Sequence, residues 1–591
     1  MPDNPTVRTP THEIRLAGEL GAFEAELTSQ PVGEGVEVVT LTLTADAPAQ
    51  PPKVSLVWDH PAVDIHGSWG PFSGRNRSLS PDWSTGSVSR VTSGAPVRCL
   101  YSLDGQNRLT VAASDALNAV SLSAGVREET ARFVCRVAPF AEPGPAIDRY
   151  EIAVRLDTRP VPYFRALADV GDWWASLEGF APAPVPEIAR LPMYSSWYSF
   201  HQGLDVDAVV RQCELSKQLG CEAVIVDDGW QTTDSARGYA YCGDWAPERI
   251  PAMGKFVRRV HEAGLKFILW YSVPLVGIHS EAFKRLAGKF LYDNPHLNAS
   301  IVDPRFPDVR EYLIGTYETA MREWDLDGFK LDFVDCFAPR ENTPQRSDGD
   351  GRDYDSVAAA ADRLMSDVIE RLRAIRSDVC IEFRQSYVGP LMRKYGNMFR
   401  AGDCPNDAVT NRVRTIDIRL LCGSTAAHAD MLMWHADDPV ESAALQLLNV
   451  LFSVPQISVL LDRIPGEHVD MLRFWLGFWR EHRDVLLDGT LEPRSPVALY
   501  PVIVASTAAK RVVAVYDHAV ADPGPNVPDE LLVVNATRSG RVVIDLAEPL
   551  DERTMRVLDC RGREVARETV NLPAGARGIE IPPAGLAVLT A

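Results

Sequence analysis

A short segment in the second half of the chain combines charged and aromatic residues in a strand-like pattern. Residues 325–337 read DLDGFKLDFVDCF, in which apolar and aromatic side chains alternate with Lys330 and Asp332. This period of two predicts a strand behind a glycine turn, with Lys330 and Asp332 on the same side of it. An unpaired charge in an ordinary core costs several kcal/mol. We therefore expect Asp332 to be a catalytic carboxylate, with Lys330 beside it.

Other polar and aromatic residues stand at or just after the ends of further predicted strands. They are Asp227, Asp228, Trp230, Asp244, Trp245, Trp270, Glu382, Arg384, Gln385, Arg400, Asp403, Asp430, Trp434 and His435. A single Asp after a strand is more often a turn residue or a helix cap than a catalyst, and Asp407 has the position of such a cap. The convergence of carboxylates, cations and tryptophans at one rim is what indicates a site.

Two carboxylates with hydrogen-bond donors and tryptophans are typical of glycoside hydrolysis. One carboxylate attacks or stabilises the anomeric carbon, and the other protonates the departing oxygen. Tryptophan rings pack on sugar C–H faces, while charged side chains bind the hydroxyls. Asp332 and Asp403 are the expected pair, and a separation of about 5–5.5 Å would give retention of configuration. The chain has no HExxH, Cys/His or GxSxG motif, which disfavours a metal hydrolase or an esterase.

The elements that must position these residues alternate between strand and helix patterns. This alternation predicts a (β/α)₈ TIM barrel over residues 189–490. The expected strands are 193–199, 223–228, 266–272, 329–334, 380–384, 398–402, 429–434 and 456–461. A doubly wound open sheet is the alternative, but no GxGxxG follows any of these strands.

Short alternating strands with turn residues between them occupy both flanks of the barrel. They predict an N-terminal β-sandwich over 1–188 and a C-terminal antiparallel β-sandwich over 491–591. The fold class is thus multidomain α/β plus all-β. The stretch 64–72 fits no strand, and a surface loop is favoured over a segment that leans on another domain. Residues 340–353 are expected to form a mobile loop near the mouth or a solvated linker.

Composition narrows the classes of partner. The chain has 591 residues, of which 46% are hydrophobic and 24% charged, as in an ordinary soluble protein. Its net charge of −20 disfavours nucleic acid and anionic membranes as partners. No apolar run reaches the roughly 18 residues of a membrane span. The start, MPDNPTVRTPTHEIRL, has no apolar signal region, and no CxxC pair occurs. We expect a cytoplasmic protein with free thiols.

Several short motifs, in the same order along the chain, make the sequence resemble the α-galactosidase and raffinose-synthase group, family 36 of the glycoside hydrolases in the melibiase clan. The matching pieces are WYSF at 197–200, DDGW at 227–230, GDWAP at 243–247, GLKFILW at 264–270, KLD at 330–332 and RAGD at 400–403. They cover the barrel, about half of the chain. The order of sandwich, barrel and sandwich also fits this family.

The resemblance implies a double-displacement mechanism on a small α-galactosyl oligosaccharide or glycoside. Asp332 would be the nucleophile and Asp403 the general acid and then base. Lys330 would keep Asp332 ionised, and Asp403 must stay protonated until it donates, which burial favours. The implied substrate-binding residues are Trp197, Asp227, Asp228, Trp230, Asp244, Trp245, Trp270, Lys330 and Arg400. No metal or organic cofactor is required, and a homo-oligomer is expected from the family alone.

One departure concerns the loop after the fifth strand. Many family members carry a glycine-rich CxSGGGR loop there, whereas residues 380–387 read CIEFRQSY. Arg384 is a further candidate donor to the substrate, and an ion pair with Glu382 is its alternative. Besides an α-galactosidase, an α-glycosidase for another sugar and a transglycosylase of this fold stay open. From a different class, a sugar-binding protein without turnover is the third hypothesis.

Overall fold

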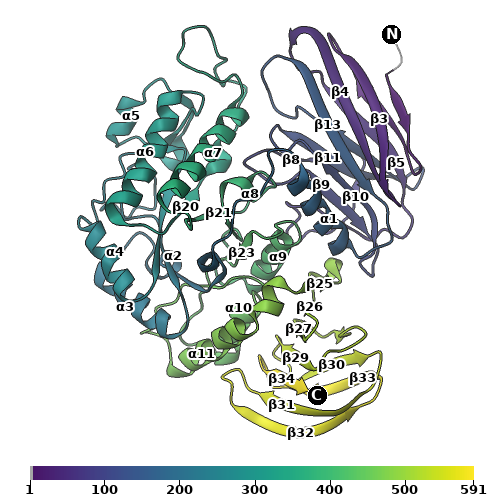
Figure 1. The fold of residues 1–591 in the computed structure, drawn as a ribbon, viewed down its shortest axis with the longest axis vertical. Helices are drawn as coiled ribbons and strands as arrows, with labels where there is room; N and C mark the ends of the chain where they lie inside the picture. The colour runs from purple at the N-terminus through teal and green to yellow at the C-terminus, as the bar shows by residue number, and fades with distance from the viewer. Residues whose placement is uncertain (1–3) are drawn as a thin grey trace.

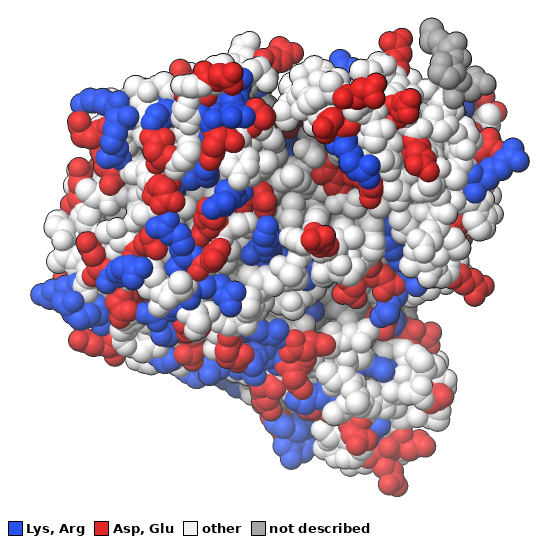
Figure 2. Space-filling model, turned by 45° about the horizontal axis from the view of Figure 1, so that its top comes forward, with Lys and Arg blue, Asp and Glu red and all other residues white. Residues whose placement is uncertain are grey.

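The computed structural model describes residues 4–591, and it consists of a central barrel with a β-rich unit before and after it in the sequence. In Figure 1 the barrel is teal and green, the N-terminal strands are purple and blue, and the C-terminal strands are yellow. Figure 2 shows side chains of both charges intermixed over the visible surface. The fold class predicted from the sequence is confirmed.

The barrel is one sheet of eight parallel strands in the order β23-β22-β21-β20-β16-β15-β14-β24. Their bounds are β14 (Met193–Ser195), β15 (Ala223–Val226), β16 (Lys266–Ser272), β20 (Gly328–Asp332), β21 (Cys380–Arg384), β22 (Met398–Arg400), β23 (Ala426–His428) and β24 (Gln456–Ile457). Isolated parallel bridges from His428 to Val454 and from Leu432 to Ile457 join the two outer strands. The sheet is therefore nearly closed.

Helices with the expected apolar periodicity cover the outside of the barrel. They are α3 (Val206–Gln218), α4 (Met253–Glu262), α6 (Pro307–Trp324), α7 (Val357–Ile375), α9 (Ala408–Arg419), α10 (Val440–Leu448) and α11 (Gly466–Glu481). Shorter elements lie in the loops: α2 (Trp197–Phe200), α5 (Glu281–Arg285), α8 (Met392–Tyr395), β17 (Leu275–Gly277), β18 (Phe290–Asn294) and β19 (Ala299–Val302). Asp407 caps α9 by accepting a hydrogen bond from the Thr410 N–H, as its position predicted.

Three barrel strands differ from their predicted bounds by more than two residues: the first, the seventh and the eighth, which ends at Ile457 instead of residue 461. The seventh strand is residues 426–428, whereas 429–434 was expected. Met431 and Leu432 in the expected segment are buried, so their apolar pattern reflects burial in a loop and not pairing in the sheet. The first strand ends at Ser195 because the chain turns into helix α2 directly afterwards.

The N-terminal unit is a sandwich of two sheets with one apolar core between them. One sheet has the order β1-β2-β5-β12-β11-β7, with β8 also paired to β11, and the other has the order β3-β4-β13-β10-β9-β6. The bounds are β1 (Thr6–Arg8), β2 (Glu13–Gly18), β3 (Glu24–Gly33), β4 (Val36–Ala49), β5 (Val54–Pro61), β6 (Gly67–Trp69), β7 (Ser80–Pro81), β8 (Ser87–Ser89), β9 (Val97–Tyr101), β10 (Asn107–Ala113), β11 (Val120–Arg127), β12 (Arg132–Ala138) and β13 (Ile147–Asp157).

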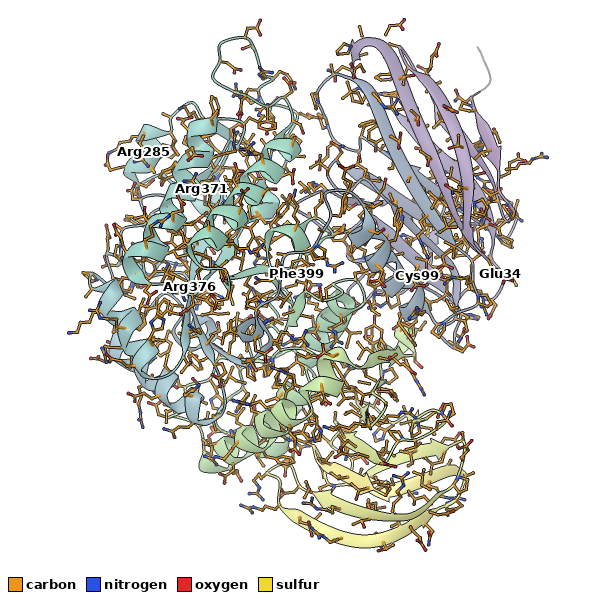
Figure 3. All side chains as sticks on the ribbon, viewed as in Figure 1. Glu34, Cys99, Arg285, Arg371, Arg376 and Phe399 are labelled. Atoms are coloured by element: carbon orange, nitrogen blue, oxygen red, sulfur yellow. The ribbon has the colours of Figure 1, made fainter. Side chains whose placement is uncertain are left out.

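A helix that the sequence analysis did not predict, α1 (Tyr163–Ser176), follows this sandwich. Its buried Leu167, Val170 and Trp174 belong to the same apolar cluster as the barrel. Cys99 on β9 and Phe399 on β22, both labelled in Figure 3, are also members of that cluster. The N-terminal unit thus packs directly on the barrel through a shared core.

The C-terminal unit has a sheet of order β25-β26-β27-β29-β34-β31-β32 and a small sheet of order β28-β30-β33, with its own core. The bounds are β25 (Thr490–Arg494), β26 (Val502–Ser506), β27 (Lys510–Val515), β28 (Val520–Ala521), β29 (Glu530–Asn535), β30 (Arg541–Leu546), β31 (Leu550–Leu558), β32 (Glu564–Leu572), β33 (Gly575–Glu580) and β34 (Leu586–Thr590). Most neighbours are antiparallel, but β27 pairs with β29, and β28 with β30, in parallel. We keep the divisions at 188 and 490 as proposed domain boundaries.

Asp417 on α9 connects all three units. Its Oδ1 accepts hydrogen bonds from Trp69 Nε1 at 2.8 Å and from Tyr500 Oη at 2.6 Å. The Arg77 guanidinium pairs with the same carboxylate at 2.8 Å, and both side chains are less than 5% exposed. The stretch 64–72, expected as a surface loop, therefore contains a strand whose Trp69 docks on the barrel. The alternative, a segment that leans on a neighbouring domain, is the one that the structure supports.

Replacing Asp417 by asparagine is expected to destabilise the protein by about 3–5 kcal/mol, because Arg77 would keep a buried charge without its counter-charge. Asp407→Asn is the matched control: its ion pair with Arg75 is about half exposed, and asparagine caps a helix as well as aspartate does. Urea unfolding followed by fluorescence measures both. Equal unfolding midpoints for the two variants would show that the buried Asp417–Arg77 pair does not stabilise the contact between the three units.

Candidate active site

The side chains of Asp332, Lys330 and Trp270 meet at the C-terminal ends of β20 and β16. In the register of these strands, Trp270 lies opposite Lys330 and Ser272 opposite Asp332. On the other side of β20, Lys330 lies opposite Glu382 of β21. Because parallel barrel strands end at one rim, this register brings residues distant in the sequence into one mouth.

Four donors hold the Asp332 carboxylate. Its Oδ1 accepts hydrogen bonds from Arg384 Nε at 2.9 Å, from the Phe333 N–H at 2.8 Å and from the Tyr387 hydroxyl. Its Oδ2 accepts one hydrogen bond, from Trp270 Nε1 at 3.0 Å. The two oxygens are therefore unequal, and Oδ2 is the less occupied of them.

The surroundings of Asp332 favour its charged form. Burial alone would raise the pKa of this carboxyl group. The nearby charges of Arg384 and Lys330 act more strongly, together with the hydrogen bonds from Tyr387 and Trp270. The net result is a pKa well below the ordinary value for aspartate, so Asp332 is ionised throughout the physiological range.

Asp403 follows the end of β22 by three residues and is far more accessible. Its side chain is 50% exposed, and its Oδ1 accepts a hydrogen bond from Arg400 Nη2 at 2.9 Å. Burial raises its pKa, but the charges of Arg400, Lys330 and Arg384 outweigh burial and lower the pKa below the ordinary value. Burial was expected to keep this group protonated; in the structure the cations around it favour ionisation instead.

Asp227 and Asp228 lie at the end of β15 and are both buried. Asp227 forms an ion pair with Lys330 Nζ at 2.5 Å. Asp228 accepts hydrogen bonds from the side-chain amides of Gln202 and Gln231, each at 2.6 Å. Its pKa is raised to about 6, chiefly by burial and against the effect of those two amides. The pKa of Asp228 is therefore close enough to neutral pH for this carboxyl group to be partly protonated there.

A buried chain of charges extends from Arg400 into the barrel. Besides Asp403, the Arg400 guanidinium binds Asp430 and lies 3.5 Å from Glu382. Asp430 also accepts a hydrogen bond from Tyr198 Oη at 2.9 Å. The alternative for Arg384, an ion pair with Glu382, is wrong: Arg384 binds Asp332, and Arg400 takes the place next to Glu382.

Four expected substrate-binding residues form no hydrogen bond with Asp332 within residues 4–591, although Trp230 and Trp245 both contact Trp270. The Trp230 ring is 0% exposed and packs against Trp324 of α6, in the wall of the barrel. Trp245 lines a surface hollow beside that same helix. Asp244 accepts hydrogen bonds from the N–H groups of Glu281 and Ala282, so it caps α5. Trp197 is half-buried on α2 after β14 and stacks on His201, with the ring centroids 3.8 Å apart.

Tyr387 is the site residue that sequence reasoning missed. It lies on the loop after β21, and its ring is fully buried against Phe383. Gln202 and Gln231, which hold Asp228, were missed as well. Gln231 directly follows the DDGW motif and could have been inferred from its position three residues after Asp228, whereas nothing local indicates that Gln202 reaches it from the loop after α2.

The chain can be compared with known proteins at this point. No protein-family model matches it. The "A type blood alpha-D-galactosamine galactosaminidase" of Flavonifractor plautii is 24% identical over 222 residues, 31% of this chain and 20% of that protein. The α-galactosidase AgaA of Geobacillus stearothermophilus is 24% identical over 166 residues, 25% of this chain and 22% of AgaA. The match thus spans about a fifth of each curated relative.

Solved structures match over far more of the chain. The crystal structure of AgaA, a family 36 α-galactosidase, covers 100% of this chain with 85% of its own length, at a TM-score of 0.63 and 14% identity. A variant of AgaA in complex with stachyose gives a TM-score of 0.64. The α-galactosidase of Lactobacillus brevis gives 0.61, with 99% of this chain covered by 88% of its length at 14% identity.

This chain has the fold of the family 36 glycoside hydrolases. The fold that the resemblance implied from the sequence is thereby confirmed, including the flanking β-rich units. In the described part of the chain, no group of three or more His, Cys, Asp or Glu side chains is arranged to hold a metal ion. None of the helices within 4–591 combines the length and the hydropathy required to cross a membrane.

Proposed function

We propose that this protein is a retaining α-glycoside hydrolase, and most specifically an α-galactosidase that acts on α-galactosyl oligosaccharides or glycosides. The observation that supports this most is the state of Asp332: a carboxylate held ionised by Arg384 and Lys330, with three hydrogen-bond donors on Oδ1 and one on Oδ2. A nucleophile needs a negative charge, a fixed orientation and an accessible lone pair.

In the proposed first step, Oδ2 of Asp332 attacks the anomeric carbon while the leaving oxygen takes a proton from Asp403. Arg384, Tyr387 and the Phe333 N–H hold Oδ1, which fixes the carboxylate plane during the attack. In the second step Asp403, now a carboxylate, removes a proton from water, and the water releases the sugar from Asp332. Each aspartate returns to its starting protonation state.

The Asp227–Lys330 pair is proposed to bind glycone hydroxyls. A carboxylate that accepts and an ammonium group that donates can together hold adjacent hydroxyls of one ring. Trp270 is proposed to form one wall of the same pocket, because its Nε1 donates a hydrogen bond to Asp332. Asp228 would support this pair from behind through Gln202 and Gln231, and Arg400 would hold Asp403 in place.

The identity of the sugar is proposed from the relatives. AgaA has been solved with stachyose and, as another variant, with raffinose, which favours galactose for this chain. The name of the Flavonifractor protein specifies galactosamine, which keeps another α-linked glycone as the second candidate. Transfer of the glycone to an acceptor sugar, in place of hydrolysis, is the third candidate activity. Cytoplasmic location and homo-oligomer formation remain predictions from the sequence.

A panel of 4-nitrophenyl α-glycosides of galactose, galactosamine, N-acetylgalactosamine and glucose tests this function. We expect the galactoside to be turned over with the largest kcat/KM, by at least about 10-fold, because hydroxyl-binding sites reject a sugar that leaves their groups unpaired. Proton NMR of the first product should show the α-anomer. A different preferred sugar would replace galactose in the proposal, and a β-anomer as the first product would overturn retention.

A further inference from the structure

A cavity of about 430 Å³ lies beside Asp403, between the barrel and the N-terminal sandwich. Arg384, Gln385 and Arg414 line its barrel side. Phe72, 44% exposed, lines its sandwich side and packs over Gly94, where any Cβ would collide with the ring. The cavity is large enough for a small ligand, and it combines an aromatic face with polar groups.

The cavity has a defined place in the proposed reaction. Asp403 lines it, whereas Asp332, Asp227 and Lys330 do not. If Asp403 protonates the leaving oxygen, the group attached to that oxygen must lie on the Asp403 side of the glycone. The inference therefore rests on the proposed function and concerns the leaving group, not the sugar that binds near Asp332.

Apart from Asp403, which is reserved for the leaving oxygen, the free hydrogen-bonding groups of Arg384, Gln385 and Arg414 on the barrel side are donors. Arg414 reaches across from α9, and its Nη1 donates to the carbonyl oxygens of Gly402 and Asp403 at 2.8 and 2.9 Å. Its Nε and Nη2 have no hydrogen-bond partner within residues 4–591. In the same range, Nη2 of Arg384 and Nε2 of Gln385 also lack one. Such a wall favours a ligand rich in acceptor oxygens.

Arg414 also carries a charge that no neighbour balances. Arg384 pairs with Asp332, Asp403 with Arg400, and Asp417 with Arg77. Among residues 4–591, no carboxylate forms an ion pair with Arg414. A guanidinium with two free donor nitrogens suits a carboxylate or phosphate group, which accepts two parallel hydrogen bonds.

We propose that the leaving group of the preferred substrate carries an oxyanion, which binds Arg414 in this cavity. Phe72 packs on the apolar face of that leaving group, and Arg384 and Gln385 bind its hydroxyls. The carboxylate of a sugar acid and the phosphate of a polyol phosphate share this chemistry.

Two matched pairs of substrates test the proposal. One pair is the 3-carboxyphenyl and 3-carbamoylphenyl α-galactosides, and the other is α-galactosyl glycerol with and without a 3-phosphate. We expect kcat/KM to be at least about 10-fold higher for the charged member of at least one pair, as for a charge-assisted hydrogen bond. Which pair shows the larger ratio distinguishes a carboxylate from a phosphate.

Variants then locate the effect. Arg414→Gln should reduce the charged-to-neutral ratio to about 1, and Arg414→Lys should keep part of it. Arg75→Gln is the matched control, because Arg75 is a nearby guanidinium already paired with Asp407 and does not line the cavity. It should keep the wild-type ratio. Because each variant is judged by a ratio, a general loss of activity does not affect the reading.

Several outcomes would overturn the inference. Equal kcat/KM values within both pairs, or a ratio that survives in Arg414→Gln, would show that Arg414 binds no oxyanion. Failure of the proposed function looks different: then neither the charged nor the neutral galactosides would be hydrolysed. As a second readout that needs no charged substrate, inorganic phosphate at constant ionic strength should inhibit hydrolysis of a neutral galactoside by the wild type at least about threefold more strongly than by Arg414→Gln.

Discussion

Replacing Asp332 by alanine is expected to lower the turnover of 4-nitrophenyl α-galactoside by about 10⁴-fold or more, as removal of a nucleophile does in other enzymes with covalent intermediates. The loss follows from the structure because Asp332 is the one carboxylate at the rim that Arg384, Tyr387 and Trp270 all orient. Within residues 4–591 no other carboxylate binds those three donors, so none can replace it.

Rescue by azide is a more specific test of Asp332 as the nucleophile. In Asp332→Ala, a small anion can occupy the space of the missing carboxylate and attack the same face of the sugar, which would give β-galactosyl azide. Asp325→Asn is the matched control, since Asp325 is an exposed carboxylate at the other end of the same strand, in a left-handed turn that asparagine tolerates. The assignment is wrong if Asp332→Ala, verified as folded by circular dichroism, retains wild-type turnover.

Replacing Asp403 by alanine is expected to produce a loss that depends on the leaving group. Raffinose, whose leaving alcohol needs a proton, should react about 10²–10⁴-fold more slowly, the range typical of general acid catalysis. The formation of the glycosyl-enzyme from 2,4-dinitrophenyl α-galactoside, whose leaving group needs no proton, should change less than about 10-fold. Asp407→Asn, four residues further along the same loop, is the control, because its carboxylate caps α9.

The pH profile gives an independent check on Asp403. The arginines and Lys330 lower its pKa in the free protein, so its protonated form is lost as the pH rises through a value below the ordinary one. For raffinose, kcat/KM should therefore fall about tenfold per pH unit from pH 5 to pH 7. Asp332 stays ionised over this range, and the titration of Asp228 near pH 6 affects all substrates alike. The activated aryl galactoside, and raffinose in Asp403→Ala, should lack this dependence. A flat wild-type profile for raffinose would show that another group donates the proton.

Local patterns in the sequence were sufficient to predict the barrel and the position of its central residues. Alternation around Lys330 and Asp332 identified β20, and apolar periodicity identified helices such as α7 and α9. These signals work because strand and helix periods are visible within a few residues. The same local reading misplaced the seventh strand, since a buried loop and a buried strand have the same apolar pattern.

The contacts that complete the site could not be predicted in this way. Arg384 and Tyr387 reach Asp332 from a different strand and loop, and no periodicity indicates that contact. Asp244 stands in a motif-like piece, yet its carboxylate caps α5 because that helix begins beside it in space. Trp230 is in the wall of the barrel because α6 brings Trp324 against it. In each case the deciding partner is distant in the sequence.

The measurement that tests the central claim most directly is to trap the covalent intermediate. The protein would be incubated with a fluorinated galactosyl fluoride, which forms the glycosyl-enzyme faster than water releases it, and then digested and analysed by tandem mass spectrometry. We expect a single fluorogalactosyl ester on Asp332. An ester on Asp403 or on any other residue would contradict this expectation, as would complete turnover of the reagent without any labelled peptide.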